Sequence, residues 1–469
     1  MITNIRLSNF RAFQSAVDVR LRPITVLIGK NSSGKSSLIK FLLMLRQTLE
    51  SPSDQFFVTE GKDVKLGTWL DLRHTNTRKG PYTDSDFRYH IRIETEDLPL
   101  PQFQAMWQAV SAGQFVSSEG DKIRVNLEFA KESLKSDSPK GQFEINGRVH
   151  YGKEFKYGTH EVVGRWNHQT GSFQQKASNL KRTGFLRFAE RTDSVGKLVA
   201  GVAAEQFLET LRREFISPKY LSPIRVESQR VVQTGSTPVR DVGQKGEFAI
   251  PHLAEILQDP ERGDQAAFIR KYAASVAKVE GLTAQRRFAK MLTEIKGRNP
   301  ETQADCLLAD FGFGVSQSLP IFVQAAMHRP GELLVVEQPE AQLHPTAQLE
   351  LGSMFAELWQ ERRVPSLLET HSPNILLRLR KLISKGELKA SDVSVAFFDL
   401  GKGSRPSKQP LDDYVEKLGV GIEPAGRFPA VVVKNLDINP DGSLEKGLPM
   451  EFFGADIREA LDFGKEQND

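Results

Sequence analysis

The stretch "ITVLIGKNSSGKSSLIKFLLMLRQTLE", residues 24–50, decides the fold. Its first six residues are apolar or β-branched and predict a buried strand, whereas its last fifteen have the spacing of a helix. Between them, "GKNSSGKSS" fits the pattern G-x-x-x-x-G-K-[ST]. Glycines let such a loop fold around a chain of phosphates, and the free amides at the helix start complement the negative charge. The sequence therefore predicts a phosphate-binding loop.

The side chains of this loop have separate expected roles. Lys35 would reach the terminal phosphates, and the Ser36 hydroxyl would bind Mg²⁺. A Gly/Ser-rich turn that matches the pattern by chance is the alternative, and the strand before it and the helix after it disfavour that alternative. The other expected nucleotide contacts in the loop are Gly29, Asn31, Ser32, Ser33, Gly34 and Ser37.

A second acidic position is expected in "LLVVEQPEAQLHP", residues 333–345. Glu337 ends an apolar strand, where a carboxylate holds Mg²⁺ directly or through water. An acid that merely caps the sheet is the alternative. The next residue, Gln338, carries an amide, which cannot accept a proton. Glu340 is the nearest substitute carboxylate, provided that the turn after the strand aims it correctly.

Two further segments predict polar groups near the nucleotide. In "DFGFGVSQSLPIFVQAAM", residues 310–327, Gly314 belongs to a tight turn, and Ser316 and Gln317 begin a helix. Another helix already follows the phosphate loop, so this one would bind a nucleotide in trans, across a dimer; an ordinary helix cap is the alternative. His371 follows the apolar strand "SLLE" and would contact a γ-phosphate or the attacking water, or else make a structural hydrogen bond.

Composition bounds the class of protein. The chain has 469 residues, of which 39% are hydrophobic and 26% charged, as in a globular protein of about three domains or one large domain with insertions. The formal charge of +4 permits nucleic-acid contact without arguing for it. Cys306 is the only cysteine, which favours a reducing compartment. Neither a signal-peptide core nor a membrane-length apolar run is present, so a cytoplasmic protein is expected.

The order of the expected elements predicts an α/β fold. Strands and helices alternate from Leu333 to Leu400, with helices at 346–361 and 373–385, which indicates a parallel sheet with ligands at the carboxyl ends of its strands. Alternating polar and apolar residues in 51–215 indicate antiparallel sheet.

Three more helices are expected at 203–215, 251–259 and 264–297. The expected division of the chain is an N-terminal half of the phosphate-loop domain (1–75), a β-rich lobe (76–215), a loop and helical segment (216–300), a C-terminal half of that domain (301–400) and a C-terminal segment (401–469).

Five motifs, in this order, resemble those of ABC-type ATPases, the superfamily that includes SMC proteins. They are Phe10-Arg11 after the first strand, "GKNSSGKSS", "GFGVSQSLP", "EQPEAQLHP" and "ETHSPN". The resemblance is strongest to prokaryotic AAA15 or OLD-like ATPases of the DUF3696-type branch, which "VTEGKDVKLGTWLDL", "YLSPIRVESQR" and "LEKGLPMEFFGADI" also fit.

The resemblance implies an ABC-type nucleotide-binding sheet that binds ATP and Mg²⁺. In a head-to-head homodimer, the phosphate loop and Glu337 of one subunit would face Ser316 and its neighbours in the other. Arg11 would touch the nucleotide, and His371 would be the switch histidine.

The sequence departs from its apparent relatives in two ways. Beyond residue 385 it lacks the Glu-Gly strand and the Asp-x-Asp strand of a TOPRIM nuclease, so we expect no DNA cleavage by this chain. The segment "DINPDG", residues 437–442, is expected to be a tight turn rather than a calcium loop.

The second departure is Gln338, which occupies the place of the catalytic glutamate. Loss of a general base typically costs about 10²–10⁴-fold in rate. Slow hydrolysis and a long-lived ATP-bound dimer are expected.

Three functions remain open at this stage. The first is an ATP-driven switch that controls a separate effector, a nuclease or toxin, as in the antiphage defence modules to which such ATPases often belong. The second is an SMC-like ATPase that clamps DNA, which the lack of heptads and the weak net charge disfavour. The third is an ATP-gated scaffold without nucleic acid. Basic stretches such as "RRFAKMLTEIKGR", residues 286–298, leave nucleic-acid binding open, although such a stretch is more often a solvated face.

Overall fold

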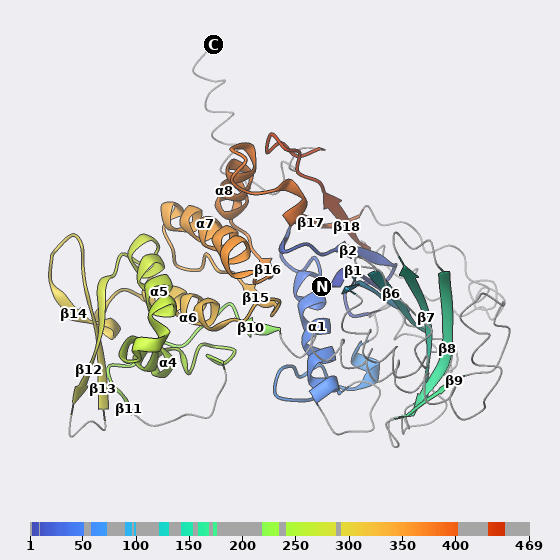
Figure 1. The fold of residues 1–469 in the computed structure, drawn as a ribbon, viewed down its shortest axis with the longest axis horizontal. Helices are drawn as coiled ribbons and strands as arrows, with labels where there is room; N and C mark the ends of the chain where they lie inside the picture. The colour runs from blue at the N-terminus through green and yellow to red at the C-terminus, as the bar shows by residue number, and fades with distance from the viewer. Residues whose placement is uncertain are drawn as a thin grey trace, which may run out of the picture.

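The computed structural model describes residues 2–8, 10–50, 58–72, 90–95, 98–99, 122–130, 142–152, 158–167, 172–175, 218–233, 241–287, 292–401 and 430–445. At its centre is a six-stranded sheet (Figure 1). Its strands, in spatial order, are β10 (Lys219–Leu221), β15 (Leu334–Glu337), β16 (Ser366–Glu369), β3 (Ile24–Gly29), β17 (Val393–Leu400) and β18 (Val431–Leu436). All neighbours are parallel except β17 and β18. The expected α/β fold with a parallel sheet is confirmed.

Both faces of this sheet are buried, which explains why its strands are nearly continuous apolar runs. In β3, Val26 belongs to one hydrophobic cluster and its neighbour Leu27 to another. The cluster of Val26 includes buried residues of α4 to α8, and the cluster of Leu27 includes residues of α1, β1 and β2. The sheet is thus a middle layer, with α1 on one side and the later helices on the other (Figure 1).

The helices that cover the sheet are α1 (Lys35–Glu50), α4 (Ala249–Gln258), α5 (Gly263–Ser275), α6 (Phe313–Met327), α7 (Pro345–Arg362) and α8 (Pro373–Ser384). Two of them, α7 and α8, start with a capping side chain and a proline. Helix α8 has Pro373 in its first turn, and the Ser372 hydroxyl accepts a hydrogen bond from the Asn374 amide at 3.1 Å. Short 3₁₀ helices cover Trp69–Leu72, Pro260–Arg262, Leu308–Asp310 and Ala390–Asp392. The helices expected at 346–361 and 373–385 are confirmed.

A second, antiparallel sheet forms the lobe at the right of Figure 1. Its strands are β2 (Val17–Arg20), β1 (Ile2–Ser8), β4 (His90–Thr95), β6 (Lys122–Ala130), β7 (Gln142–Gly152), β8 (Gly158–Asn167) and β9 (Ser172–Gln175), with β5 (Leu98–Pro99) beside β6. The antiparallel sheet expected in 51–215 is confirmed for β4 to β9, and β1 and β2 extend it. The helix expected at 203–215 lies outside the described residues.

The third sheet corrects the sequence analysis. It comprises β11 (Val232–Gln233), β13 (Leu292–Arg298), β12 (Glu280–Arg287) and β14 (Asp305–Leu307), at the left of Figure 1. The helix expected at 264–297 ends at Ser275. The prediction of helix is wrong for the rest of that range, which is mainly a β-hairpin. The reason is a period of two in β13, where Thr293 and Ile295 are buried between more exposed neighbours.

The arginines of this hairpin have polar partners. Arg287 Nε donates to Glu294 Oε2 at 3.0 Å, and Arg298 Nε donates to Asp305 Oδ1 at 2.9 Å. Arg286 Nε donates to Gln258 Oε1 at 2.6 Å. These contacts favour a solvated face over a nucleic-acid surface for the basic stretch.

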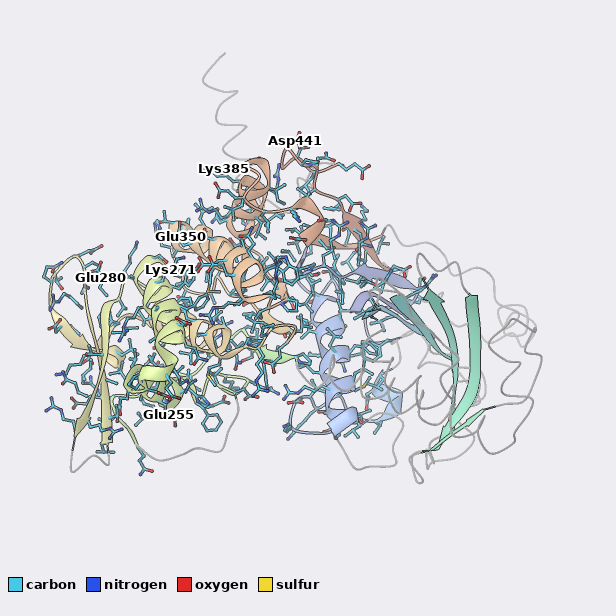
Figure 2. The ribbon with its side chains drawn as sticks, viewed as in Figure 1. Glu255, Lys271, Glu280, Glu350, Lys385 and Asp441 are labelled. Carbon is cyan, nitrogen blue, oxygen red and sulfur yellow. The ribbon has the colours of Figure 1, made fainter. Side chains whose placement is uncertain are left out.

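Two peripheral contacts hold the helical layer together. Between α5 and α7, on which Figure 2 labels Lys271 and Glu350, the Tyr272 hydroxyl donates to Glu357 Oε2 at 2.6 Å. Arg380 Nε on α8 donates to the carbonyl oxygen of Gly442 at 2.7 Å. The segment "DINPDG" is the tight turn that was expected, closed by the bridge between Ile438 and Leu444.

Candidate functional site

The phosphate loop connects the end of β3 to the start of α1. Gly29 has φ +140°, and a Cβ there would lie 2.1 Å from the carbonyl oxygen of Phe398 on β17, so only glycine fits. Asn31 and Ser32 are exposed at the loop surface. Ser33 is fully buried, and its hydroxyl has no hydrogen-bond partner among the described residues. The loop therefore has the backbone shape and the spare polar groups that a phosphate chain needs.

Lys35 lies at the centre of this loop. Its side chain is buried, and Nζ donates to the carbonyl oxygens of Gly29 at 2.9 Å and of Lys30 at 2.7 Å. Burial lowers the pKa of Lys35, and the nearby carboxylates of Glu369 and Glu337 act in the opposite direction. The ammonium group thus faces two acids across the loop.

These two acids end neighbouring strands. Glu337 on β15 and Glu369 on β16 are register partners at the carboxyl edge of the parallel sheet, and both are buried. The Ser36 hydroxyl donates to Glu369 Oε2 at 3.0 Å. Burial, followed by repulsion from Glu337, raises the pKa of Glu369 to about 7, and burial raises the pKa of Glu337. Sequence reasoning missed Glu369, although "SLLE" has the same strand-then-acid pattern as "LVVE".

The donor set fits Mg²⁺. Ser36, Glu337 and Glu369 offer only oxygen atoms, which this hard cation prefers, and a cation between two buried acids would relieve their repulsion. Within the described ranges, no group of three or more His, Cys, Asp or Glu side chains could hold a metal ion. Two carboxylates and a hydroxyl nevertheless suffice for Mg²⁺, because phosphate oxygens and water commonly complete its shell.

The turn after β15 places Gln338 and Glu340 differently from each other. Gln338 has φ +46°, and its backbone amide donates to the carbonyl oxygen of Glu369 at 2.7 Å. Glu340 points to the neighbouring turn, where its Oε1 accepts a hydrogen bond from the His371 amide at 2.8 Å. Burial raises the pKa of Glu340. Burial, assisted by Lys35, lowers the pKa of His371, so this imidazole is neutral at pH 7.

Arg11 lies in a turn that supports the phosphate loop. It has φ +47°, and its backbone amide donates to the carbonyl oxygen of Leu72 at 2.7 Å. In the same turn, the Phe13 ring would lie 2.8 Å from a Cβ at Gly34 of the loop. The turn therefore packs directly against the loop and keeps Arg11 near it.

The start of α6 differs from its expected position. The helix begins at Phe313 rather than at Ser316, so Gly314 lies in its first turn. A glycine is required there because a Cβ would lie 2.8 Å from the carbonyl oxygen of Gln342. Ser316 and Gln317 are buried and already bonded within the chain: the Ser316 hydroxyl accepts from the Ser228 amide at 3.1 Å. In the part of the chain that the structure describes, no hydrogen bond joins these side chains to the phosphate loop.

A family model now identifies the fold that carries this geometry. The AAA ATPase domain of the AAA15 type matches residues 1–181 and 253–376, a range that includes the phosphate loop, both acids and His371. The chain belongs to the AAA15 ATPase family. Among curated proteins, none matches this AAA15 ATPase.

Solved structures give a more distant likeness. The AAA15 ATPase resembles the SMC head domain from Thermotoga maritima at 9% identity and a TM-score of 0.37, covering 87% of this chain and 99% of that one. It also resembles an SMC head bound to the C-terminal winged-helix domain of ScpA, at 10% identity and a TM-score of 0.43 over 93% and 98% of the two chains. No described helix is long and apolar enough to cross a membrane.

Proposed function

We propose that this AAA15 ATPase binds ATP with Mg²⁺ at the phosphate loop, hydrolyses it slowly, and uses the ATP-bound dimer as its long-lived state. The observation that supports this most is the convergence of Lys35, Ser36, Glu337 and Glu369 at the carboxyl edge of the sheet. Ligands of parallel α/β sheets bind at this edge. A phosphate chain with its cation is the ligand that one buried ammonium and two buried acids suit.

In this proposal, most binding groups come from one chain. Lys35 holds the terminal phosphates, and the backbone amides of the loop, together with Ser33 and Ser37, hold the others. Ser36, Glu337 and Glu369 bind Mg²⁺, which neutralises charge on the phosphate oxygens when it is bound. Asn31, Ser32 and Arg11 face the nucleotide from the exposed side and the supporting turn.

Slow hydrolysis follows from the groups after β15. Gln338 stands next to the metal-binding acid, and its amide cannot take a proton from water. The Glu340 carboxylate is engaged with the His371 amide, which supports a positioning role toward the switch histidine rather than that of a general base. We therefore expect a rate about 10²–10⁴-fold below that of a site with a well-placed base.

The dimer is supported by the surroundings of α6. Phe313 at the helix start is 46% exposed, and the nearby loop exposes Ile224 to 75% and Val231 to 40%. Exposed apolar groups beside a polar helix start suit an interface with a second copy. The start of α6 would then meet the nucleotide of the partner chain.

The biological role that we propose is control of a separate effector, a nuclease or toxin, in antiphage defence. This part follows from the sequence resemblance and from the lack of nuclease motifs after residue 385. Addition of the purified neighbouring gene product to the ATP-bound and ADP-bound chain tests it. Effector activity that is identical with ATP and with ADP would contradict it.

Single-turnover hydrolysis of ATP by the wild type and by Gln338→Glu tests the chemistry. We expect the variant to be faster by about 10²-fold or more, because it restores a proton acceptor beside the metal site. Gln233→Glu, at an exposed position of β11 in the third sheet, is a matched control without this effect. A wild type already as fast as Gln338→Glu would contradict slow hydrolysis, and loss of that activity in Glu340→Gln would assign the base to Glu340.

A further inference from the structure

One short segment contacts both halves of the proposed site. Residues 220–228, which we call the coupling segment, begin within β10 and run on beyond its end. Figure 1 shows β10, the edge strand of the central sheet, between α1 and α6. At the start of the segment, the Tyr220 hydroxyl donates to Glu337 Oε1 at 2.7 Å. Burial, followed by the charge of Glu337, raises the pKa of Tyr220, so the hydroxyl stays a donor at physiological pH. The first residue of the segment is thus hydrogen-bonded directly to Glu337, the acid proposed to bind the metal.

Arg225, in the middle of the segment, bridges the two halves. Its side chain is 2% exposed, Nη2 donates to the carbonyl oxygen of Glu337 at 2.8 Å, and Nη1 donates to the carbonyl oxygen of Gln317 at 2.9 Å. Its backbone amide and carbonyl oxygen bond the Gln317 side chain at 3.0 and 2.8 Å. Burial lowers the pKa of Arg225 to about 10, so it remains a cation at pH 7. One planar guanidinium therefore joins the end of β15 to the start of α6.

The last residue of the segment completes the hold on α6. The Ser228 amide and hydroxyl each lie 3.1 Å from the Ser316 hydroxyl. Over nine residues, the segment therefore contacts Glu337 at one end and Ser316 at the other.

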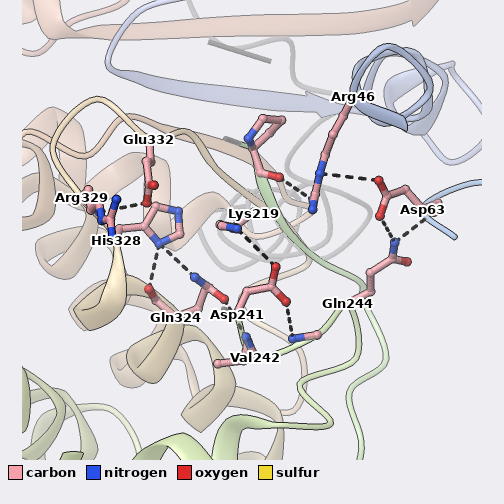
Figure 3. Close-up of polar contacts among 12 residues, drawn as sticks. Arg46, Asp63, Lys219, Asp241, Val242, Gln244, Gln324, His328, Arg329 and Glu332 are labelled. Atoms are coloured by element: carbon pink, nitrogen blue, oxygen red, sulfur yellow. Dashed lines mark hydrogen bonds and ion pairs between the residues drawn. The ribbon is translucent and has the colours of Figure 1, made fainter. Parts of the chain in front are cut away.

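The start of the segment is also fixed from outside (Figure 3). Lys219, the residue before the segment, has its Nζ 3.3 Å from Asp241 Oδ2. The backbone amide of Val242, which follows Asp241, donates to Gln324 Oε1 on α6 at 3.0 Å. Gln244 Nε2 donates to Asp63 Oδ1 at 3.1 Å. The segment itself is bonded to this stretch, because the Ser222 amide donates to the carbonyl oxygen of Gln244 at 2.8 Å.

We propose that the coupling segment relays binding of MgATP at Glu337 to the start of α6. When Glu337 and Ser36 hold Mg²⁺, the Glu337 carboxylate would give up its hydrogen bond from Tyr220, and the displacement would pass through Arg225 to Gln317. Tyr220 and Arg225 are positioning residues in this scheme, since they act through Glu337 and α6. The inference rests on the proposed function for the role of Glu337 and of α6, and it adds a physical link between two places that serve different nucleotides in the dimer.

Hydrogen exchange in the single chain tests the relay. The wild type is measured with and without saturating MgATP, at a protein concentration where its mass shows no dimer. We expect MgATP to slow exchange in residues 29–38 and to change exchange in 313–318 by about fivefold, the effect of one net hydrogen bond. In Tyr220→Phe and in Arg225→Lys, the response of 29–38 stays and that of 313–318 falls to less than half.

A matched variant and two outcomes decide the result. Arg378→Lys removes another Arg hydrogen bond, to Ser353 at 2.8 Å between α8 and α7, and leaves the response of 313–318 intact. The relay is overturned if 313–318 fails to respond in the wild type or responds equally in Tyr220→Phe. Retained exchange protection elsewhere in Tyr220→Phe, which removes a single hydroxyl, shows that the variant is folded. Failure of the proposed dimer would instead appear as an unchanged mass at high concentration with MgATP, whatever the exchange result.

Discussion

The phosphate-loop half of the site and the start of α6 are built in opposite ways. In the first, four groups converge within one chain: Glu337 and Glu369 end the adjacent parallel strands β15 and β16, and Lys35 and Ser36 begin α1. In the second, Ser316 and Gln317 are buried against the coupling segment. Around them, Phe313 and Ile224 are exposed. The comparison teaches that, under the proposed function, one chain supplies nearly all the groups for a nucleotide and its cation, whereas the start of α6 is the part proposed to meet a second copy.

Removal of Lys35 should have the largest effect on the first half. In Lys35→Ala, the loop loses its only buried ammonium, and charge-assisted hydrogen bonds of this kind are worth about 1.5–3 kcal/mol each. We expect ATP affinity to fall about 100-fold or more, measured by titration with a fluorescent ATP analogue. Lys30→Ala, at the exposed position beside it, is the control. Equal affinities of Lys35→Ala and the wild type would remove the phosphate loop from the site.

The second prediction tests whether Glu369 binds the metal ion in the phosphate-loop half of the site. Glu369→Gln keeps the shape and removes the charge, so we expect Mg²⁺ or Mn²⁺ to bind the ATP complex about tenfold more weakly. Electron paramagnetic resonance of Mn²⁺ reads metal binding directly, without hydrolysis. Glu332→Gln, on the loop before β15, serves as the control. Unchanged Mn²⁺ affinity in Glu369→Gln would leave Ser36 and Glu337 as the only protein ligands.

Variants of Glu340 distinguish a positioning role of this residue from a role as the general base. Because Glu340 Oε1 accepts the His371 amide, Glu340→Gln preserves an acceptor, whereas Glu340→Ala leaves the amide unpaired. We expect single-turnover rates within about threefold of the wild type for Gln and about tenfold lower for Ala, as one hydrogen bond of a buried group predicts. Rates abolished equally in both variants would mean that the carboxylate itself takes the proton.

The smallest effect on the proposed activity is expected from the last prediction, which concerns the pH dependence of stability without metal. The pKa of Glu369 is about 7 in the folded chain, above its ordinary value, so the folded state binds more protons than the unfolded state between about pH 4.5 and 7. Stability therefore falls as pH rises through this window, by about 3 kcal/mol for a shift of this size. Urea unfolding in a chelator should show this fall in the wild type and a reduced fall in Glu369→Gln. An identical slope in both would show that Glu369 is not the group that titrates.

Local sequence patterns were sufficient for the elements of the first half. A strand, a glycine loop and a helix in direct succession predicted the phosphate loop, and apolar runs ending in acids predicted β15 and β16. The pairing of Glu337 with Glu369 was not predictable, because it depends on which strands become neighbours in the sheet. The β12–β13 hairpin was mistaken for helix because its Ala, Gln, Glu, Lys and Arg residues are also good helix formers.

Long-range contacts were beyond the reach of these patterns. Arg225 meets Glu337 from 112 residues away, out of a Pro- and Ser-containing loop with no periodicity. The start of α6 was misplaced by three residues because Gly314, which looked like a turn residue, is required by the close approach of Gln342.

The mass of the chain in solution tests the division into two halves most directly. We expect the single-chain mass with MgADP, twice that mass with MgATP, and a single-chain mass with MgATP for Phe313→Asp, which charges the exposed apolar position at the start of α6. Phe313→Asp should still bind the fluorescent ATP analogue as the wild type does, since the phosphate-loop half is complete in one chain. A wild type that keeps the single-chain mass at saturating MgATP, or a Phe313→Asp variant that doubles its mass like the wild type, would contradict the account.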